Sequence, residues 1–221
     1  MQRHLDLELS ELKDKLLKMA GHAEAQVSNA VKALVDRSDE WARRVKLDDS
    51  IVDQLEIEVD DMAVHLLSKA PLATDLRFII VATKIAQNLE RVADEATTIA
   101  RRTLKLNQEP ALKPRVEIPR MAELALEMLK TVLDAFVNRQ PDNARAVIPR
   151  DHEVDTIHKQ LQRDLASFMV EHPDAISRCL NLMIISKSIE RIADHATNIA
   201  EEVVYLCEAE DIRHGGAKNG A

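Results

Sequence analysis

The sequence contains few of the residues on which sheets and tight turns depend. Aromatic side chains make up 2% of its 221 residues, and only four positions are glycine. Hydrophobic residues nevertheless reach 46%, with Val, Ile and Leu placed among many Ala, Glu, Lys, Arg and Gln. This composition favours helix over sheet. We therefore expect an all-α protein, and 221 residues are enough to bury a core as one large domain or as two small ones.

Long apolar runs and cysteine frameworks are also missing. No segment carries the eighteen or so apolar residues that a membrane span needs, and the opening MQRHLDLELSELKDKL carries acids where a signal peptide would be apolar. Two cysteines, Cys179 and Cys207, are too few for a disulfide framework. We expect a soluble cytoplasmic protein without direct membrane insertion, whose two thiols are ordinary core or flank residues in a reducing compartment.

Positive charge is in deficit. The net charge of −8 predicts a molecule that repels nucleic acid and anionic lipid. No run of Lys and Arg is long enough to indicate a local basic patch. We expect no nucleic-acid partner.

Apolar residues recur at three- and four-residue steps along most of the chain, which is typical of amphipathic helices. The pattern predicts a helix up to about residue 34 and a second from a Ser38 N-cap to about 69, with a bend near Leu47, before Pro71 stops it. A third helix carries LERVADEATTIA and ends near residue 107. EPALKPRVEIP, with three prolines, reads as a linker. Further helices are expected over 121–140, 141–170 and 173–209, followed by a frayed tail, GGAKNGA.

The second set of helices repeats the first. LERVADEATTIA begins at Leu89 and IERIADHATNIA at Ile189, and eight of their twelve positions are identical. Pro71 and Pro173 are 102 residues apart, whereas the two long motifs are 100 apart. We expect two tandem three-helix bundles, residues 1–108 and residues 115–212, produced by duplication.

Four pairs of acids at i, i+4 spacing occupy equivalent places in the two halves. Two carboxylates at this spacing share one helix face and repel, and a divalent cation would remove that cost. The chain has seven such pairs where about six are expected by chance, so only the repeated position distinguishes these four. They are Asp49/Asp53, Glu90/Asp94, Asp151/Asp155 and Glu190/Asp194.

Helical rotation places these carboxylates beside the apolar faces, on the outer surface or flank of a bundle. Ferritin-like di-iron sites need inward-facing carboxylates and Glu-x-x-His motifs, and no glutamate here has a histidine three residues later. Nucleophile elbows, phosphate loops and HExxH motifs are missing as well. We expect no enzyme, and we treat His152, His158 and His195 as ordinary histidines rather than ligands.

The duplicated layout, the paired acidic motifs and the segments ATDLRF, SIERIADHATNIAE and EDIRH resemble the PhoU family over nearly the whole chain. One departure is Ala93 and Ala193 where the family commonly has glycine in ERIGD, a change that suits a helix interior. The resemblance implies multinuclear metal sites on the bundle surface, with Mg, Mn or Fe favoured and Zn or Ca as further candidates. The implied ligands are the eight carboxylates Asp49, Asp53, Glu90, Asp94, Asp151, Asp155, Glu190 and Asp194.

The same resemblance implies a non-catalytic regulator of phosphate uptake and phosphate-starvation signalling. Such a protein acts as a negative regulatory adaptor between the ATPase of a phosphate ABC transporter and a sensor histidine kinase, often as a homodimer. It is cytoplasmic, and peripheral at the inner membrane through its partners. The alternatives are a carboxylate-bundle metalloprotein and a purely structural helical scaffold.

The two halves differ at the next position of the acidic stripe, which is Arg101 in the first half and Glu201 in the second. Arg101 is expected to fold back toward Glu90 and Asp94 and to compete with a cation, whereas Glu201 adds an acceptor. We therefore predict higher metal occupancy in the second half. All-oxygen ligands favour hard cations, with no thiolate to select zinc.

Overall fold

The computed structural model describes residues 2–69, 72–112 and 117–213, and this part of the chain contains helices without any strand. The first half consists of α1 (Gln2–Val35), α2 (Asp39–Leu67) and α3 (Ala73–Leu106). The second half consists of α4 (Ile118–Asn138), α5 (Pro141–Val147), the 3-10 turn η1 (Ile148–Arg150), α6 (Asp151–Glu171), the 3-10 turn η2 (Pro173–Ala175) and α7 (Ile176–Glu208). The expected tail and the middle of the expected linker lie outside the described residues.

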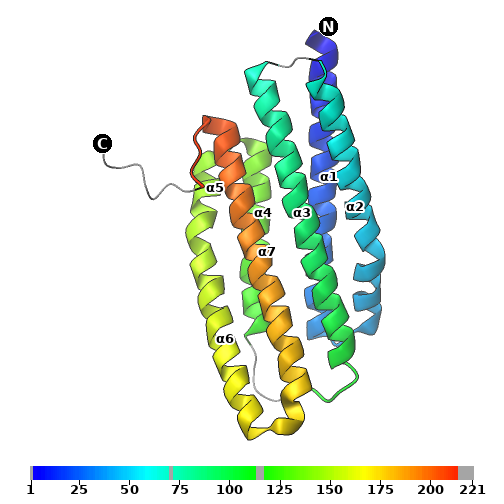
Figure 1. Cartoon of the computed structure of the whole chain (residues 1–221), viewed down its shortest axis with the longest axis vertical. Helices are drawn as coiled ribbons and strands as arrows, with labels where there is room; N and C mark the ends of the chain where they lie inside the picture. Colours follow the sequence, from blue (N-terminus) through cyan, green and yellow to red (C-terminus); the bar gives the residue numbers. More distant parts are fainter. Residues whose placement is uncertain (1, 70–71, 113–116, 214–221) are drawn as a thin grey trace, which may run out of the picture.

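Each half is a bundle of long helices, and the two bundles lie side by side (Figure 1). In the first, α1, α2 and α3 pack against one another; in the second, α7 packs against α4, α5 and α6. The halves meet mainly through α3 and α7, with a smaller contact between α1 and α4. The prediction of two tandem three-helix bundles is confirmed.

The turns that end the first helix of each half have the same backbone geometry. Arg37 and Arg139, 102 residues apart, both adopt the left-handed conformation, with φ of 51° and 52°. In the first half, Ser38 then caps α2 by accepting a hydrogen bond from the Trp41 backbone N–H at 3.4 Å. Because a left-handed residue reverses the chain after a helix, the duplication is visible in the backbone as well as in the side chains.

The helix expected over 141–170 is interrupted, which corrects the sequence prediction. It divides into α5, η1 and α6, and the interruption contains Pro149. Proline lacks the backbone N–H and clashes with the carbonyl four residues earlier, so it breaks a regular helix. Its equivalent in the first half is Leu47, where a bend was expected, and there α2 runs without interruption.

The core consists of aliphatic side chains and many alanines. Small buried side chains let the helices approach closely, and larger ones fill the layers between them. Fully buried large residues occur in both halves, among them Leu12, Met19, Ile85, Met121, Leu129 and Ile185. Among the described helices, none is both long and apolar enough to cross a bilayer.

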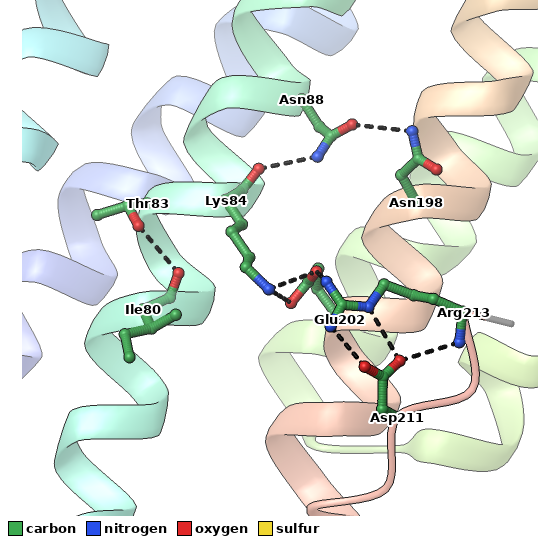
Figure 2. A network of polar contacts seen from close by, with 8 residues as sticks. All are labelled: Ile80, Thr83, Lys84, Asn88, Asn198, Glu202, Asp211 and Arg213. Carbon is green, nitrogen blue, oxygen red and sulfur yellow. Dashed lines mark hydrogen bonds and ion pairs between the residues drawn. The ribbon is translucent and has the colours of Figure 1, made fainter.

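A polar seam holds α3 against α7. Glu202, only 6% exposed, accepts hydrogen bonds from Lys84 Nζ at 3.0 and 3.2 Å (Figure 2). Arg213, after the end of α7, also reaches Glu202 and pairs with Asp211 at 2.6 Å. The two helices are antiparallel, since Lys84 meets Glu202 whereas Glu95, further along α3, meets Arg191.

Candidate functional site

The structure gathers the predicted carboxylates into one acidic cluster in each half. Two neighbouring helices supply each cluster, and its charges lie close enough to raise the pKa values of Asp49 and Glu90 in the first half and of Asp151 and Asp194 in the second. We define the first cluster as Asp49, Asp53 and Glu56 on α2 with Glu90 and Asp94 on α3. We define the second cluster as Asp151 and Asp155 on α6 with Glu190 and Asp194 on α7.

The first cluster is partly neutralised by one arginine. Arg91 Nε lies 3.3 Å from Glu90 Oε2, and another nitrogen of its guanidinium lies 3.6 Å from Asp94 Oδ2. Thr97 Oγ1 donates to Asp49 Oδ1 at 2.9 Å. Burial, the leading cause, and the neighbouring carboxylates raise the pKa values of Asp49 and Glu90.

Glu56, one turn beyond Asp53 on α2, extends the first cluster. Its pKa is raised by burial first and then by Asp60, with smaller contributions from Asp53 and Asp94. Glu56 is not among the eight carboxylates predicted from the sequence, because helical spacing alone does not show that α3 approaches this side of α2. The first cluster therefore offers five carboxylates where four were predicted.

The second cluster contains the most strongly perturbed acid. Burial, together with the charges of Glu190 and Asp151, raises the pKa of Asp194 to about 6. Burial and Asp155 raise the pKa of Asp151, whose Oδ1 is buried without a hydrogen-bond partner. A carboxylate oxygen left in this state is costly, and a bound cation or proton would satisfy it.

The two remaining carboxylates of the second cluster, Glu190 and Asp155, are paired with lysines. Lys187 Nζ lies 2.6 Å from Glu190 Oε1, and Lys159 Nζ lies 2.6 Å from Asp155 Oδ2. Glu190 is 8% exposed, which is more buried than the outer surface expected for these motifs. The helical rotation of α7 alone could not show that α6 covers this part of its flank.

The expected role of Arg101 is also corrected. Its Nε donates to the Thr97 carbonyl at 3.4 Å, and its charge acts on Asp49. The cation that contacts Glu90 and Asp94 is Arg91. Arg91 lies three residues before Asp94, a spacing at which side chains on a helix meet, and its long side chain also reaches the adjacent Glu90.

Two of the three histidines beside the acidic motifs, His158 and His195, have neutral hydrogen-bond partners. His158 Nδ1 lies 3.1 Å from Ser186 Oγ, and His195 Nδ1 lies 2.9 Å from Asn88 Oδ1 across the α3–α7 contact. Burial lowers the pKa values of both. These imidazoles therefore have structural roles in the bundle and the seam.

The clusters fit a hard cation by chemistry but are not arranged around one. No three His, Cys, Asp or Glu side chains in residues 2–69, 72–112 and 117–213 are placed to share a metal ion. All predicted donors are carboxylate oxygens, which suit Mg, Mn, Fe or Ca. The pKa values of Asp49 and Glu90 in the first cluster, and of Asp151 and Asp194 in the second, are raised, so added positive charge would favour the ionised carboxylates in both. Binding would require rotation of carboxylate side chains toward a common point.

Tandem three-helix bundles with an acidic cluster at the same place in each define a class of duplicated helical proteins with candidate cation sites. The PhoU domain model matches this chain twice, over residues 16–103 and 118–203. The chain belongs to the PhoU family. Each matched segment contains one of the two clusters.

Named relatives agree with this assignment. A phosphate-specific transport system accessory protein PhoU homolog from Pseudomonas aeruginosa is 39% identical over 98% of this chain and 90% of its own length. A homolog from Thermotoga maritima is 35% identical over 95% of this chain and 90% of its own length.

Solved structures show the same fold. The crystal structure of PhoU from Pseudomonas aeruginosa superposes with a TM-score of 0.90 at 39% identity, covering 93% of this chain and 99% of the other. The phosphate transport system regulatory protein PhoU from Streptococcus pneumoniae superposes with a TM-score of 0.86 at 28% identity, covering 94% and 98%. Family and fold are thereby established together.

Proposed function

We propose that this protein is a metal-binding negative regulator of phosphate uptake and phosphate-starvation signalling. It acts as an adaptor between the ATPase subunit of a phosphate ABC transporter and the sensor histidine kinase of the phosphate regulon. Support comes from membership of the PhoU family and from relatives named as accessory proteins of phosphate-specific transport. We place it in the cytoplasm, peripheral at the inner membrane through its partners.

The observation that carries the metal-binding part is the repeated acidic cluster with perturbed carboxyls. Asp49 and Asp151, at equivalent positions, both have pKa values raised by burial and by neighbouring acids. Bound Mg, Mn or Fe, or alternatively Ca or Zn, would supply positive charge that neutralises the cluster and changes the surface a partner meets. The donors on α3 are Glu90 and Asp94, and the donors on α7 are Glu190 and Asp194.

The adaptor role needs no bond-making chemistry from the chain. In the acidic clusters, carboxylates pair with Arg91, Lys159 and Lys187, an arrangement suited to binding charge. A carboxylate-bundle metalloprotein and a structural scaffold are the other candidate functions. A structural scaffold would keep its partners irrespective of phosphate, so phosphate dependence separates it from an adaptor.

A pull-down from membranes at high and at low phosphate tests the adaptor role. We expect tagged protein to recover the transporter ATPase and the kinase, with more of the complex at high phosphate. Recovery of neither partner at either concentration would contradict the proposal. The control for variants of the clusters is Glu58→Gln. It removes a carboxylate on α2 that is paired with Lys15 outside the clusters.

We also propose a homodimer. Light scattering at working concentration should give twice the mass of the 24.9 kDa chain. A monomer mass throughout would remove this part of the proposal and leave the adaptor role standing.

A further inference from the structure

A basic pocket lies beside the C-terminal half of α3. Four cations line it, one from α2 and three from α3, together with one hydroxyl. The pocket has a volume of about 470 Å³, and its lining includes Lys46, Thr98, Arg101, Arg102 and Lys105. The sequence alone does not indicate this pocket, because Lys46 is about fifty residues from the other three cations and only the fold brings them together.

The four cations of this pocket lie outside the ion pairs of the described residues. Within the described ranges, no ion pair joins Lys46, Arg101, Arg102 or Lys105 to an acid. Arg101 donates to the Thr97 carbonyl and acts at longer range on Asp49, which already accepts a hydrogen bond from Thr97. In a chain of net charge −8, four cations around one hollow create a local positive potential.

The second half shows that the fold does not require these cations. At a spacing of 100 residues, the equivalents of Arg101, Arg102 and Lys105 are two glutamates and a tyrosine: Glu201, Glu202 and Tyr205. Basic residues near a helix C-terminus also complement the helix dipole. Yet α7 ends without a basic residue in its last turn, whereas α3 ends with Lys105. Neither the bundle nor the dipole accounts for all four charges.

We propose that this pocket binds a small anion that carries several phosphoryl groups. Guanidinium groups bind phosphoryl oxygens in a bidentate manner, and a lysine adds a point charge. The Thr98 hydroxyl supplies a neutral donor. The volume is more than ten times the roughly 30 Å³ of one water molecule, which leaves room for more than one phosphoryl group. The inference stands apart from the adaptor function and from metal binding.

Calorimetric titration of the full chain with tripolyphosphate tests the proposal, in low salt and with a chelator so that the acidic clusters hold no metal. Inorganic phosphate and phosphatidylglycerol vesicles are titrated in parallel. We expect saturable binding of tripolyphosphate that weakens as salt rises. Binding to vesicles as well would mean that the pocket also takes phosphoryl headgroups. Binding to vesicles alone would overturn the small-anion ligand.

Two charge-matched double variants locate the site. Lys46→Gln/Arg101→Gln removes two pocket cations and should weaken tripolyphosphate binding about tenfold or more, as expected for lost charge-assisted hydrogen bonds. Lys18→Gln/Arg163→Gln removes two exposed cations elsewhere; Arg163, like Arg101, donates its Nε to the carbonyl four residues earlier. Both variants should melt near the parent temperature. Equal loss in both variants, or no saturable binding by the parent, would overturn the proposal.

Discussion

Arg91 and Arg191 occupy the same position in the two halves but contact different carboxylates. Arg91 turns along α3 to Glu90 and Asp94, within the first cluster, whereas Arg191 reaches across from α7 to Glu95 on α3. The second cluster recruits Lys187 and Lys159 instead. Duplication has therefore kept the proposed metal ligands and changed the counterions around them. The comparison teaches that the two halves share a scaffold and a donor set but differ in local charge.

The largest expected effect tests the shared scaffold. Leu89 and Ile189 are equivalent, and each is at most 1% exposed. Leu89→Ala and Ile189→Ala should each lower the free energy of unfolding by about 2–5 kcal/mol, because each leaves a cavity in a packed core. Urea denaturation measures this. A loss below about 1 kcal/mol in only one half would break the equivalence of the two cores.

A smaller loss is expected at the seam, where only the second half supplies the buried acid. Glu202→Gln leaves Lys84 without its carboxylate and leaves Arg213 paired with Asp211 alone. It should cost about 1–3 kcal/mol, the usual value of hydrogen bonds to charged groups. Glu58→Gln, which removes the partner of Lys15 at the surface, should cost much less. Equal losses in urea denaturation would contradict the proposed importance of the seam.

The third prediction concerns the pH dependence of the second cluster. The pKa of Asp194 is about 6 in the folded protein, above the roughly 3.9 of an unfolded aspartate. Ionised Asp194 therefore destabilises the fold above pH 6, and this penalty disappears as the pH falls toward 4. Without metal, Asp194→Asn should be more stable than the parent at pH 7–8 and nearly equal to it at pH 4.

Asp94→Asn is the matched control for this experiment, because Asp94 lies 3.6 Å from Arg91. It should bring no comparable gain at pH 7–8. A constant stability difference between Asp194→Asn and the parent from pH 4 to pH 8 would contradict the account of the second cluster.

The smallest effect sharpens the contrast between the arginines. Arg91→Gln removes a cation that competes for Glu90 and Asp94, so Mn²⁺ should bind the first cluster about two- to fivefold more tightly, the usual worth of an exposed ion pair. Arg191→Gln, whose side chain contacts Glu95, should change Mn²⁺ affinity less. Calorimetric titration compares them, and identical changes would show that the two arginines do not differ in function.

The backbone plan of the molecule follows from the sequence because repetition and helix signals are local. The 102-residue spacing of Pro71 and Pro173 also relates Arg37 to Arg139, and the two share a left-handed conformation. The interruption at Pro149 was a signal present in the sequence but overlooked, since proline at that position predicts a break. Helix existence and repeat alignment were therefore predictable.

The charges around the clusters were less predictable because they depend on tertiary contacts. The repeated i, i+4 pattern selected the eight carboxylates as predicted ligands, but it did not predict that Arg91 rather than Arg101 contacts Glu90 and Asp94. Burial of Glu190 depends on the approach of α6, and the basic pocket joins Lys46 to α3 across about fifty residues. Spacing along one helix contains none of this information.

We propose that both clusters bind metal and that the second binds it more fully. The most direct test is the metal content of the parent after equilibration with Mn²⁺, beside Glu90→Gln/Asp94→Asn and Glu190→Gln/Asp194→Asn. We predict bound metal in the parent and a larger loss in the second variant, where Asp194 and the unpartnered Asp151 oxygen gain most from a cation. Equal losses would contradict the asymmetry, and a parent without bound metal would contradict the sites themselves.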